Sequence, residues 1–224
     1  MQREIIVTAD GSKTIHIPEW NEQYHSTHGA LQEARHVFLK NGLEQLAPNT
    51  AVKILEVGFG TGLNAILTLE AAWKANLTIQ YVGLEAYPVS TLEIEELNYT
   101  DLFENQDLKK LYQLMHRAPW NEVVEILPGF TLEKRHEKME TFEAQFEQFD
   151  LIYFDAFGPR TQPEMWELPV LQKMYRITRE NGFLVTYCAK GQVKRDLKTV
   201  GYEVEVLPGP PGKREMTRAF KRMD

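Results

Sequence analysis

Several features that identify large classes of protein are missing from this chain of 224 residues. Cys188 is its only cysteine, so no intrachain disulfide can form. No apolar run approaches the roughly 18 residues that a membrane-spanning helix needs. The segment from Met1 to Glu4 lacks the apolar core of a secretory signal peptide. These absences exclude a disulfide scaffold and a membrane-spanning protein, and they favour the reducing cytoplasm.

A metal site and a cysteine nucleophile are also disfavoured. His25 and His28 suggest metal ligands, but no cysteine or carboxylate follows them at ligand spacing. Cys188 stands at the end of an apolar run that begins at Phe183, where a small core residue is more expected than a nucleophile. We therefore expect a protein without a bound metal.

Basic residues are unevenly distributed along the chain. The net charge of −7 does not indicate a nucleic-acid-binding protein. Between residues 189 and 224, however, nine basic residues stand against five acidic ones, which leaves that segment at +4 and the remainder at −11. Such a distribution can guide a polyanion to one face of a molecule. An ordinary solvated surface is the simpler interpretation, and the charge pattern alone favours it.

The segment from Ile54 to Asn64, ILEVGFGTGLN, combines an apolar run with three glycines at alternate positions. Val52 to Val57 is typical of a buried parallel strand, and from Leu63 onward the apolar spacing is that of a helix. Glycines at 58, 60 and 62 allow positive φ angles and a close approach of a ligand to the backbone. Strand, glycine turn and helix in this order predict a nucleotide-binding crossover.

The spacing of the glycines and two nearby acids indicate which nucleotide is bound. A dinucleotide fingerprint has the pattern G-x-G-x-x-G, whereas Leu63 stands here where the third glycine would be. Glu56, at the strand end, would repel a diphosphate but suits a ligand with a cationic amino group. Glu85 follows the next apolar strand, where a carboxylate can bind two ribose hydroxyls. These features favour S-adenosylmethionine (SAM), which has an ammonium, a sulfonium and no phosphate, over a dinucleotide or a turn without a ligand.

Acidic residues follow four of the predicted parallel strands. Glu56, Glu85, Glu140 and Asp155 each stand at or just after the expected end of an apolar strand. In an open α/β sheet, ligands bind at the carboxyl ends of the strands. We therefore expect these four carboxylates at one edge of the sheet, around the ligand.

The rest of the pattern predicts one α/β unit with a short N-terminal extension, and we place the boundary between residues 1–50 and 51–224. Two β-like runs, 4–8 and 13–17, flank Asp10-Gly11, which is a hairpin signal. A helix begins at Ala30. Near the C-terminus, strands over 201–207 and 215–221 form a closing antiparallel hairpin. Other helices are expected over 88–97, 101–116, 141–148, 163–178 and 191–200, and 130–139 fits either a strand or a helix.

The segment DAFGP, from Asp155 to Pro159, places an acid, an aromatic ring and a proline just after the fourth predicted parallel strand. This arrangement is similar to the D-P-P-[YF] motif of amine N-methyltransferases. Methyl transfer from a sulfonium is an in-line displacement, so the amine must present an aimed, neutral lone pair. Asp155 can accept protons of the amine, and Phe157 can favour a developing ammonium by a cation–π contact of ~0.5–2 kcal/mol. The alternative role of Asp155 is to cap a following helix.

Three segments of the chain resemble a single family. They are EVGFGTGLN at 56–64, DAFGPRTQPEMW at 155–166 and GPPGKREMTR at 209–218, with further similarity at Tyr24-x-Ser26 and over 33–39. Together they look like the methyltransferase half of the bifunctional MnmC family, and the resemblance spans nearly the whole chain. That family uses SAM to methylate the exocyclic amine of 5-aminomethyl-2-thiouridine at the wobble position of tRNA.

The resemblance implies a fold, a cofactor and a set of site residues. The fold is α/β, a Rossmann-like class I SAM-dependent methyltransferase with a mostly parallel seven-stranded sheet and an antiparallel C-terminal strand. Asp155 and Phe157 are the implied catalytic residues. The residues expected to bind SAM are Glu56, Gly58, Gly60, Gly62, Asn64, Glu85, Glu140 and Asp155. With tRNA as substrate, the basic residues expected to contact it are Lys190, Lys194, Arg195, Lys213 and Arg214.

The chain also departs from the family pattern. The FAD-dependent oxidase domain that removes a carboxymethyl group has no counterpart in this sequence, so the implied activity is methyl transfer alone. Residues 158–162 read Gly-Pro-Arg-Thr-Gln where Ala-Pro-Ala-Lys-Asn is expected, which changes the local substrate contacts. Two other functions stay open: a SAM-dependent methyl- or aminopropyl-transferase acting on a small amine, which the acidic body favours, and a non-catalytic SAM-binding module.

Overall fold

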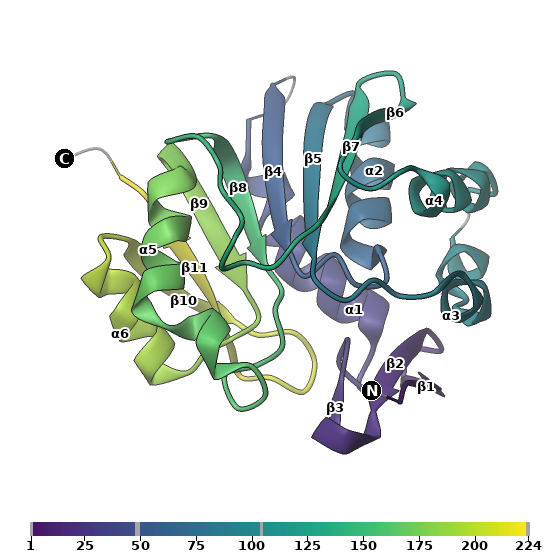
Figure 1. Ribbon diagram of the computed structural model, residues 1–224, viewed down its shortest axis with the longest axis horizontal. Helices are drawn as coiled ribbons and strands as arrows, with labels where there is room; N and C mark the ends of the chain where they lie inside the picture. Colours follow the sequence, from purple (N-terminus) through teal and green to yellow (C-terminus); the bar gives the residue numbers. More distant parts are fainter. Residues whose placement is uncertain (1, 48–49, 104, 223–224) are drawn as a thin grey trace.

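A central sheet of eight strands organises the molecule, which is described here from a computed structural model covering residues 2–47, 50–103 and 105–222 (Figure 1). The strands are β4 (Ala51–Val57), β5 (Thr78–Glu85), β6 (Val123–Leu127), β7 (Phe130–His136), β8 (Phe149–Phe154), β9 (Thr178–Thr186), β10 (Glu203–Pro208) and β11 (Glu215–Phe220). Their order is β10-β11-β9-β8-β4-β5-β7-β6. Strands β9, β8, β4, β5 and β7 are parallel to one another, whereas β11 and β6 run antiparallel to their neighbours. The expected α/β fold is confirmed, and the sheet has eight strands where seven were predicted.

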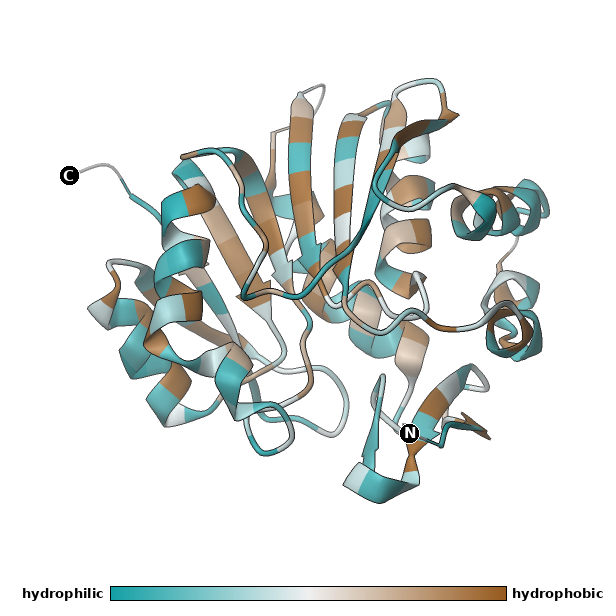
Figure 2. Ribbon diagram, in the orientation of Figure 1, coloured by the Kyte–Doolittle hydropathy of each residue, from teal (hydrophilic) through white to brown (hydrophobic). Residues whose placement is uncertain are grey.

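Helices cover both faces of this sheet, because the side chains of each strand alternate between two hydrophobic cores. Ile54 of β4 faces one core, whereas Leu55 and Val57 face the other. The first core is covered by α1 (Ala30–Ala34), the π-helical turn η2 (Arg35–Lys40), α2 (Leu63–Ala75) and α4 (Asp107–Arg117). The second is covered by α5 (Leu168–Ile177) and α6 (Gly191–Thr199). Figure 2 shows the result: apolar residues line the strands, and polar residues dominate the outer sides of the helices.

A small N-terminal sheet lies against the carboxyl ends of the central strands (Figure 1). It contains β1 (Glu4–Val7), β2 (Lys13–Ile17) and β3 (Glu22–Gln23). The predicted hairpin around Asp10-Gly11 is confirmed, since β1 pairs antiparallel with β2. The backbone of Lys13 and Gly11 bonds to Asn98, which ties this sheet to the central domain. Pro48 and Asn49, at the boundary predicted between extension and core, lie outside the described residues, as do Met1 and Asp224.

Short connecting helices complete the chain: η1 (Pro18–Trp20), η3 (Leu43–Gln45), α3 (Thr91–Glu96), η4 (Tyr99–Leu102) and η5 (Pro163–Trp166). The helix predicted over 163–178 is wrong in its middle, because it divides into η5 and α5 at Glu167. Pro169 has no N–H to donate to a preceding turn, so a continuous helix cannot pass through it. The next strand, β9, follows at once and includes Asn181 with φ 61°.

The region between β7 and β8 also differs from the prediction. Strand β7 ends at His136, so Glu140 lies in a turn beyond the strand rather than at its end. The helix predicted over 141–148 is absent. The Nζ of Lys173 donates instead to the carbonyls of Met139, Glu140 and Phe142, at 2.8–3.1 Å, and so provides hydrogen-bond partners to a segment that is not helical. Within the described part of the chain, no helix is both long and apolar enough to cross a membrane.

Candidate functional site

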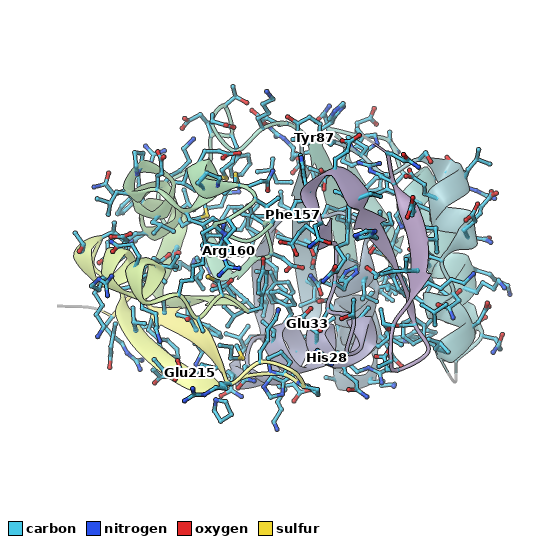
Figure 3. The ribbon with its side chains drawn as sticks, turned by 90° about the horizontal axis from the view of Figure 1, so that it is seen from below. His28, Glu33, Tyr87, Phe157, Arg160 and Glu215 are labelled. Atoms are coloured by element: carbon cyan, nitrogen blue, oxygen red, sulfur yellow. The ribbon has the colours of Figure 1, made fainter. Side chains whose placement is uncertain are left out.

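A cavity of about 590 Å³ lies at the carboxyl ends of β4, β5, β7, β8 and β9. The chain turns in opposite directions from β4, to β5 on one side and to β8 on the other, and this is where α/β sheets form ligand clefts. The N-terminal sheet and the β10–β11 turn close its remaining sides. Figure 3 views this edge, with Phe157, Glu33 and His28 near the middle and Glu215 toward the margin. Nine of the predicted site residues line the cavity, namely Glu56, Gly58, Gly60, Asn64, Glu85, Glu140, Asp155, Phe157 and Lys213.

The glycine loop connects β4 to α2 through three residues with positive φ. Gly58 has φ 93°, and a Cβ there would lie 2.8 Å from the carbonyl oxygen of Asp155, so only glycine fits without strain. Gly62 has φ 71° and precedes α2; its backbone packs against His116 rather than lining the cavity. The carbonyl of Thr61 accepts hydrogen bonds from Tyr112 at 2.7 Å and from the ring of His116 at 3.1 Å. Tyr112 is buried and His116 is half-buried, so these two bonds hold the loop in place without a ligand.

Asn64 brings two acidic residues together beneath this loop. Its Nδ2 donates to Glu56 Oε1 and to Asp155 Oδ2, each at 2.8 Å, while Tyr81 donates its hydroxyl to Glu56 Oε2 at 2.8 Å. Burial raises the pKa of the Glu56 carboxyl well above its usual value, and the negative charge of Asp155 raises it further. Burial likewise raises the pKa of Asp155, helped by the nearby charge of Glu33. Two acids with raised pKa values therefore share one amide in a buried cluster.

This cluster has capacity for a cationic ligand. The Oδ1 of Asn64 is buried and has no hydrogen-bond partner among the described residues, although its side chain lines the cavity. A bound N–H group would satisfy this oxygen. The carboxylates of Glu56 and Asp155 would be stabilised by a positive charge, which lowers raised pKa values. The two carboxylates and the amide oxygen thus fit the ammonium of SAM and disfavour a diphosphate.

Glu85 lies on the other side of the glycine loop, at the end of β5. Its Oε2 accepts the N–H of Gly60 and its Oε1 accepts the N–H of Tyr87, both at 2.8 Å. Each carboxylate oxygen retains a further lone pair, so Glu85 can also accept ribose hydroxyls. Glu140 lines the cavity from its turn after β7, beside the buried side chain of Met139.

Phe157 belongs to a cluster of aromatic rings on the opposite side of the cavity. Its ring meets those of Trp20 and Tyr24 edge to face, with centroids 5.6 Å and 5.2 Å apart. The indole of Trp166 donates to the Phe157 carbonyl at 2.8 Å and fixes the loop that presents it. No helix follows Asp155 directly, since η5 begins at Pro163, so the helix-cap interpretation of Asp155 is wrong. Trp20 was not predicted as a site residue from the sequence. Tyr24 was named only as part of a segment that resembles the family.

The predicted basic contacts are divided between the cavity and the surface. Lys213 forms an ion pair with Glu33, and its Nζ lies 4.0 Å from the centroid of the Tyr187 ring, so it is not a free surface cation. Lys194 is paired with Glu215 at 2.9 Å. Lys190, Arg195 and Arg214 are exposed and lie outside the cavity lining.

The residues considered for metal or nucleophilic chemistry have other environments. The ring of His25 bonds to the Thr14 hydroxyl at 3.0 Å, and burial lowers the pKa of His25 to about 4. Among the residues that the structure describes, no three His, Cys, Asp or Glu side chains form a group that could hold a metal ion. Cys188 is buried in the second core, as predicted, and burial raises the pKa of its thiol.

Comparison with known proteins agrees with this geometry. Residues 130–222 match a family described as S-adenosyl-L-methionine-dependent methyltransferase. The tRNA 5-methylaminomethyl-2-thiouridine biosynthesis bifunctional protein MnmC of Cupriavidus necator is 34% identical over 98% of this chain, and that of Hydrogenovibrio crunogenus is 31% identical over 88%. The chain spans about a third of the length of these relatives, 34% and 31% respectively.

Solved structures show the same similarity. The crystal structure of MNMC2 from Aquifex aeolicus superposes with a TM-score of 0.81 at 27% identity, over 100% of this chain and 71% of that one. Spermidine synthase from Thermotoga maritima superposes with a TM-score of 0.57 at 15% identity, over 98% and 74% of the two chains, which shows a shared fold.

Proposed function

We propose, from the premise that this chain belongs to the S-adenosyl-L-methionine-dependent methyltransferases, that it methylates the 5-aminomethyl group of wobble (2-thio)uridine in tRNA. The product is 5-methylaminomethyl-(2-thio)uridine. The relatives named for tRNA 5-methylaminomethyl-2-thiouridine biosynthesis support the substrate. Because the chain matches a third of their length, the proposal covers methyl transfer alone. We place this reaction in the cytoplasm, and we treat residues 1–50 as an extension of a core formed by 51–224.

The donor side of the cavity carries the residues that we assign to SAM. When bound, SAM supplies a sulfonium methyl group, which an amine nitrogen takes by forming a C–N bond as the C–S bond breaks with its electron pair left on sulfur. Glu56 and Asn64 would hold the ammonium of the donor, and Glu85 its ribose hydroxyls. The loop of Gly58, Gly60 and Gly62 would bring the backbone close to the donor, and Glu140 would contact it from the turn after β7.

The acceptor side carries Asp155 and Phe157. Asp155 is the acid that accepts protons from the attacking amine, and its raised pKa makes it a stronger base than an exposed carboxylate. Phe157 offers its ring to the ammonium that develops as the new bond forms. Trp20 and Tyr24 hold that ring in place from the N-terminal sheet.

A single observation carries the proposal: Asn64 joins Glu56, on the donor side, to Asp155, on the acceptor side, through two hydrogen bonds of 2.8 Å. A donor cation and an acceptor amine would therefore meet across one fixed side chain. Orientation of two reactants in this way is a large part of the rate enhancement in bimolecular transfers.

Nucleoside analysis tests the function. The protein is incubated with SAM labelled in its methyl group and with tRNA that carries 5-aminomethyl-(2-thio)uridine; a parallel reaction contains putrescine instead of tRNA. We expect label in 5-methylaminomethyl-(2-thio)uridine and none in the diamine. Label that enters putrescine but never the wobble nucleoside would refute the proposal in favour of a small-amine transferase. Binding of SAM without transfer of either the methyl label or an aminopropyl group would indicate a non-catalytic module.

A further inference from the structure

The cavity has many more acids than bases. Eight carboxylates line it, from Glu22, Glu33, Glu56, Glu85, Glu137, Glu140, Asp155 and Glu164, against two lysines, Lys138 and Lys213, and two histidines, His25 and His28. An anionic site favours the protonated form of an alkyl amine. An ammonium has no lone pair and cannot attack a methyl group, so this excess of negative charge opposes the proposed reaction.

Lys213 is the lysine that reaches the acceptor side. It comes from the turn between β10 and β11, and its Nζ is held by Glu33 of α1 and by the face of the Tyr187 ring. Tyr187 donates its hydroxyl to the carbonyl of Ala156, the residue after Asp155, at 2.8 Å. Lys138, by contrast, follows β7, which β4 and β5 separate from β8. Lys213 is therefore anchored beside the loop that carries Asp155.

The position of Lys213 is fixed from several directions. Glu33 is buried, and its Oε2 accepts the N–H of Ser26 at 2.7 Å, which leaves Oε1 for the lysine. Gly212, with φ 83°, packs so closely on the His28 ring that a Cβ would overlap it. The turn is thus seated against the N-terminal segment, and the ammonium of Lys213 has little freedom to leave the cavity wall.

We propose that Lys213 is a positioning residue whose fixed ammonium keeps both Asp155 and the acceptor amine in their proton-free forms. This inference rests on the proposed function. The charged and titratable groups near Asp155 are Glu56 on β4, Tyr81 on β5, Glu33 on α1, Tyr187 after β9 and Lys213 on the hairpin. In this set Glu33 raises the pKa of Asp155 and Lys213 lowers it. The amine enters the same field, so the lysine favours its neutral form too.

The pH dependence of methylation distinguishes this role from a structural one. Lys213→Met removes a positive charge, so the rising limb of the pH profile of kcat/KM should move to higher pH by roughly one unit. Glu33→Gln removes a negative charge and should move the same limb to lower pH. Lys213→Arg should restore the wild-type profile. If the ion pair served only to hold the hairpin, both neutral variants would lose activity without opposite shifts, and the proposal would be wrong.

Two controls keep the outcome clear. Glu205→Gln breaks a second ion pair of the same hairpin, Arg218 with Glu205 at 2.8 Å, which lies outside the cavity lining, so its profile should match the wild type. Thermal unfolding checks that each variant is folded. If Lys213→Met does not fold or is inactive, the pH profile of Glu33→Gln tests the proposal alone. A shift to lower pH supports the proposal, and no shift or a shift to higher pH overturns it.

A measurement without catalysis separates this inference from the function. Carbon-13 NMR titration of the Asp155 carboxyl in the free protein should show a higher pKa in Lys213→Met and a lower pKa in Glu33→Gln. Unchanged titration would overturn the role of Lys213 even if wobble uridine is methylated. If the wild type fails to methylate tRNA while these shifts appear, the proposed function is wrong and the effect of Lys213 on Asp155 stands.

Discussion

Asn64 uses both hydrogens of its amide on two carboxylates and leaves its own oxygen without a partner in the described part of the chain. An amide is well suited to this position because it can donate twice and still accept a hydrogen bond from a ligand. A carboxylate at 64 would add a third buried negative charge, and an aliphatic residue would leave Glu56 and Asp155 without a shared donor. The geometry of the site thus depends on one uncharged side chain placed between two acids.

Replacing Asp155 tests the acceptor side at the scale of one residue. Asp155→Asn keeps an oxygen that can accept the bond from Asn64 but removes the group that takes up a proton. We expect SAM affinity, measured by calorimetry, to be retained and the single-turnover methylation rate to fall ~10²–10⁴-fold. A variant with full activity would show that Asp155 does not serve as the base.

The sequence predicted some of the residues that line the cavity and missed others. Glu56, Glu85 and Asp155 were found because each follows an apolar strand, and strand ends are a local signal; their roles stay predictions. Trp20 and Glu33 were missed because they reach the cavity only through the packing of the N-terminal segment on the sheet. Lys213 was assigned to the surface, since its partner Glu33 is 180 residues away and no local pattern encodes that pair.

At the scale of elements, glycine is required in the turn after β4 for two reasons, backbone strain and close packing. Two substitutions can separate them. Gly58→Ala combines a φ of 93° with a contact to the Asp155 carbonyl, so we expect a loss of about 2–4 kcal/mol in unfolding free energy and much weaker SAM binding. Gly129→Ala is the matched control, because φ is 85° but no atom lies closer than 3.8 Å to the added Cβ. It should cost about 1–2 kcal/mol and leave SAM affinity intact. Urea unfolding and calorimetry provide both values; equal SAM affinities in the two variants would contradict this assignment.

Elements defined by their own sequence were predicted well, and those defined by a distant partner were not. The glycine crossover, the N-terminal hairpin and the closing hairpin have strong turn signals and are present. The helix expected over 141–148 is absent, and Lys173, on α5, binds two carbonyls just before this stretch and the carbonyl of Phe142 within it. A helical pattern is a weak preference, and tertiary hydrogen bonds of this kind override it.

At the scale of the molecule, the question is how an acidic protein would bind tRNA. Lys213 is committed to Glu33, so the exposed residues Lys190 and Arg214 are the better candidates for phosphate contacts. Lys190→Glu combined with Arg214→Glu should weaken binding to every tRNA, whatever its sequence. The slope of the salt dependence of tRNA binding should fall by about one for each phosphate that is no longer neutralised. SAM affinity should not change. Lys74→Glu, on the far end of α2, is the control; tRNA affinity equal to that of the control would dismiss this surface.

The pair of Glu33 and Lys213 also bears on how the protein is made. Its members are separated by 180 residues, whereas the glycine loop and Glu56 belong to the first third of the chain. A nascent chain on the ribosome therefore contains the glycine loop well before the turn that completes the cavity wall. Until that turn emerges, Glu33 has no lysine to pair with, and the cavity stays open on that side. The site is consequently complete only after this turn has been translated, although its glycine loop is made much earlier.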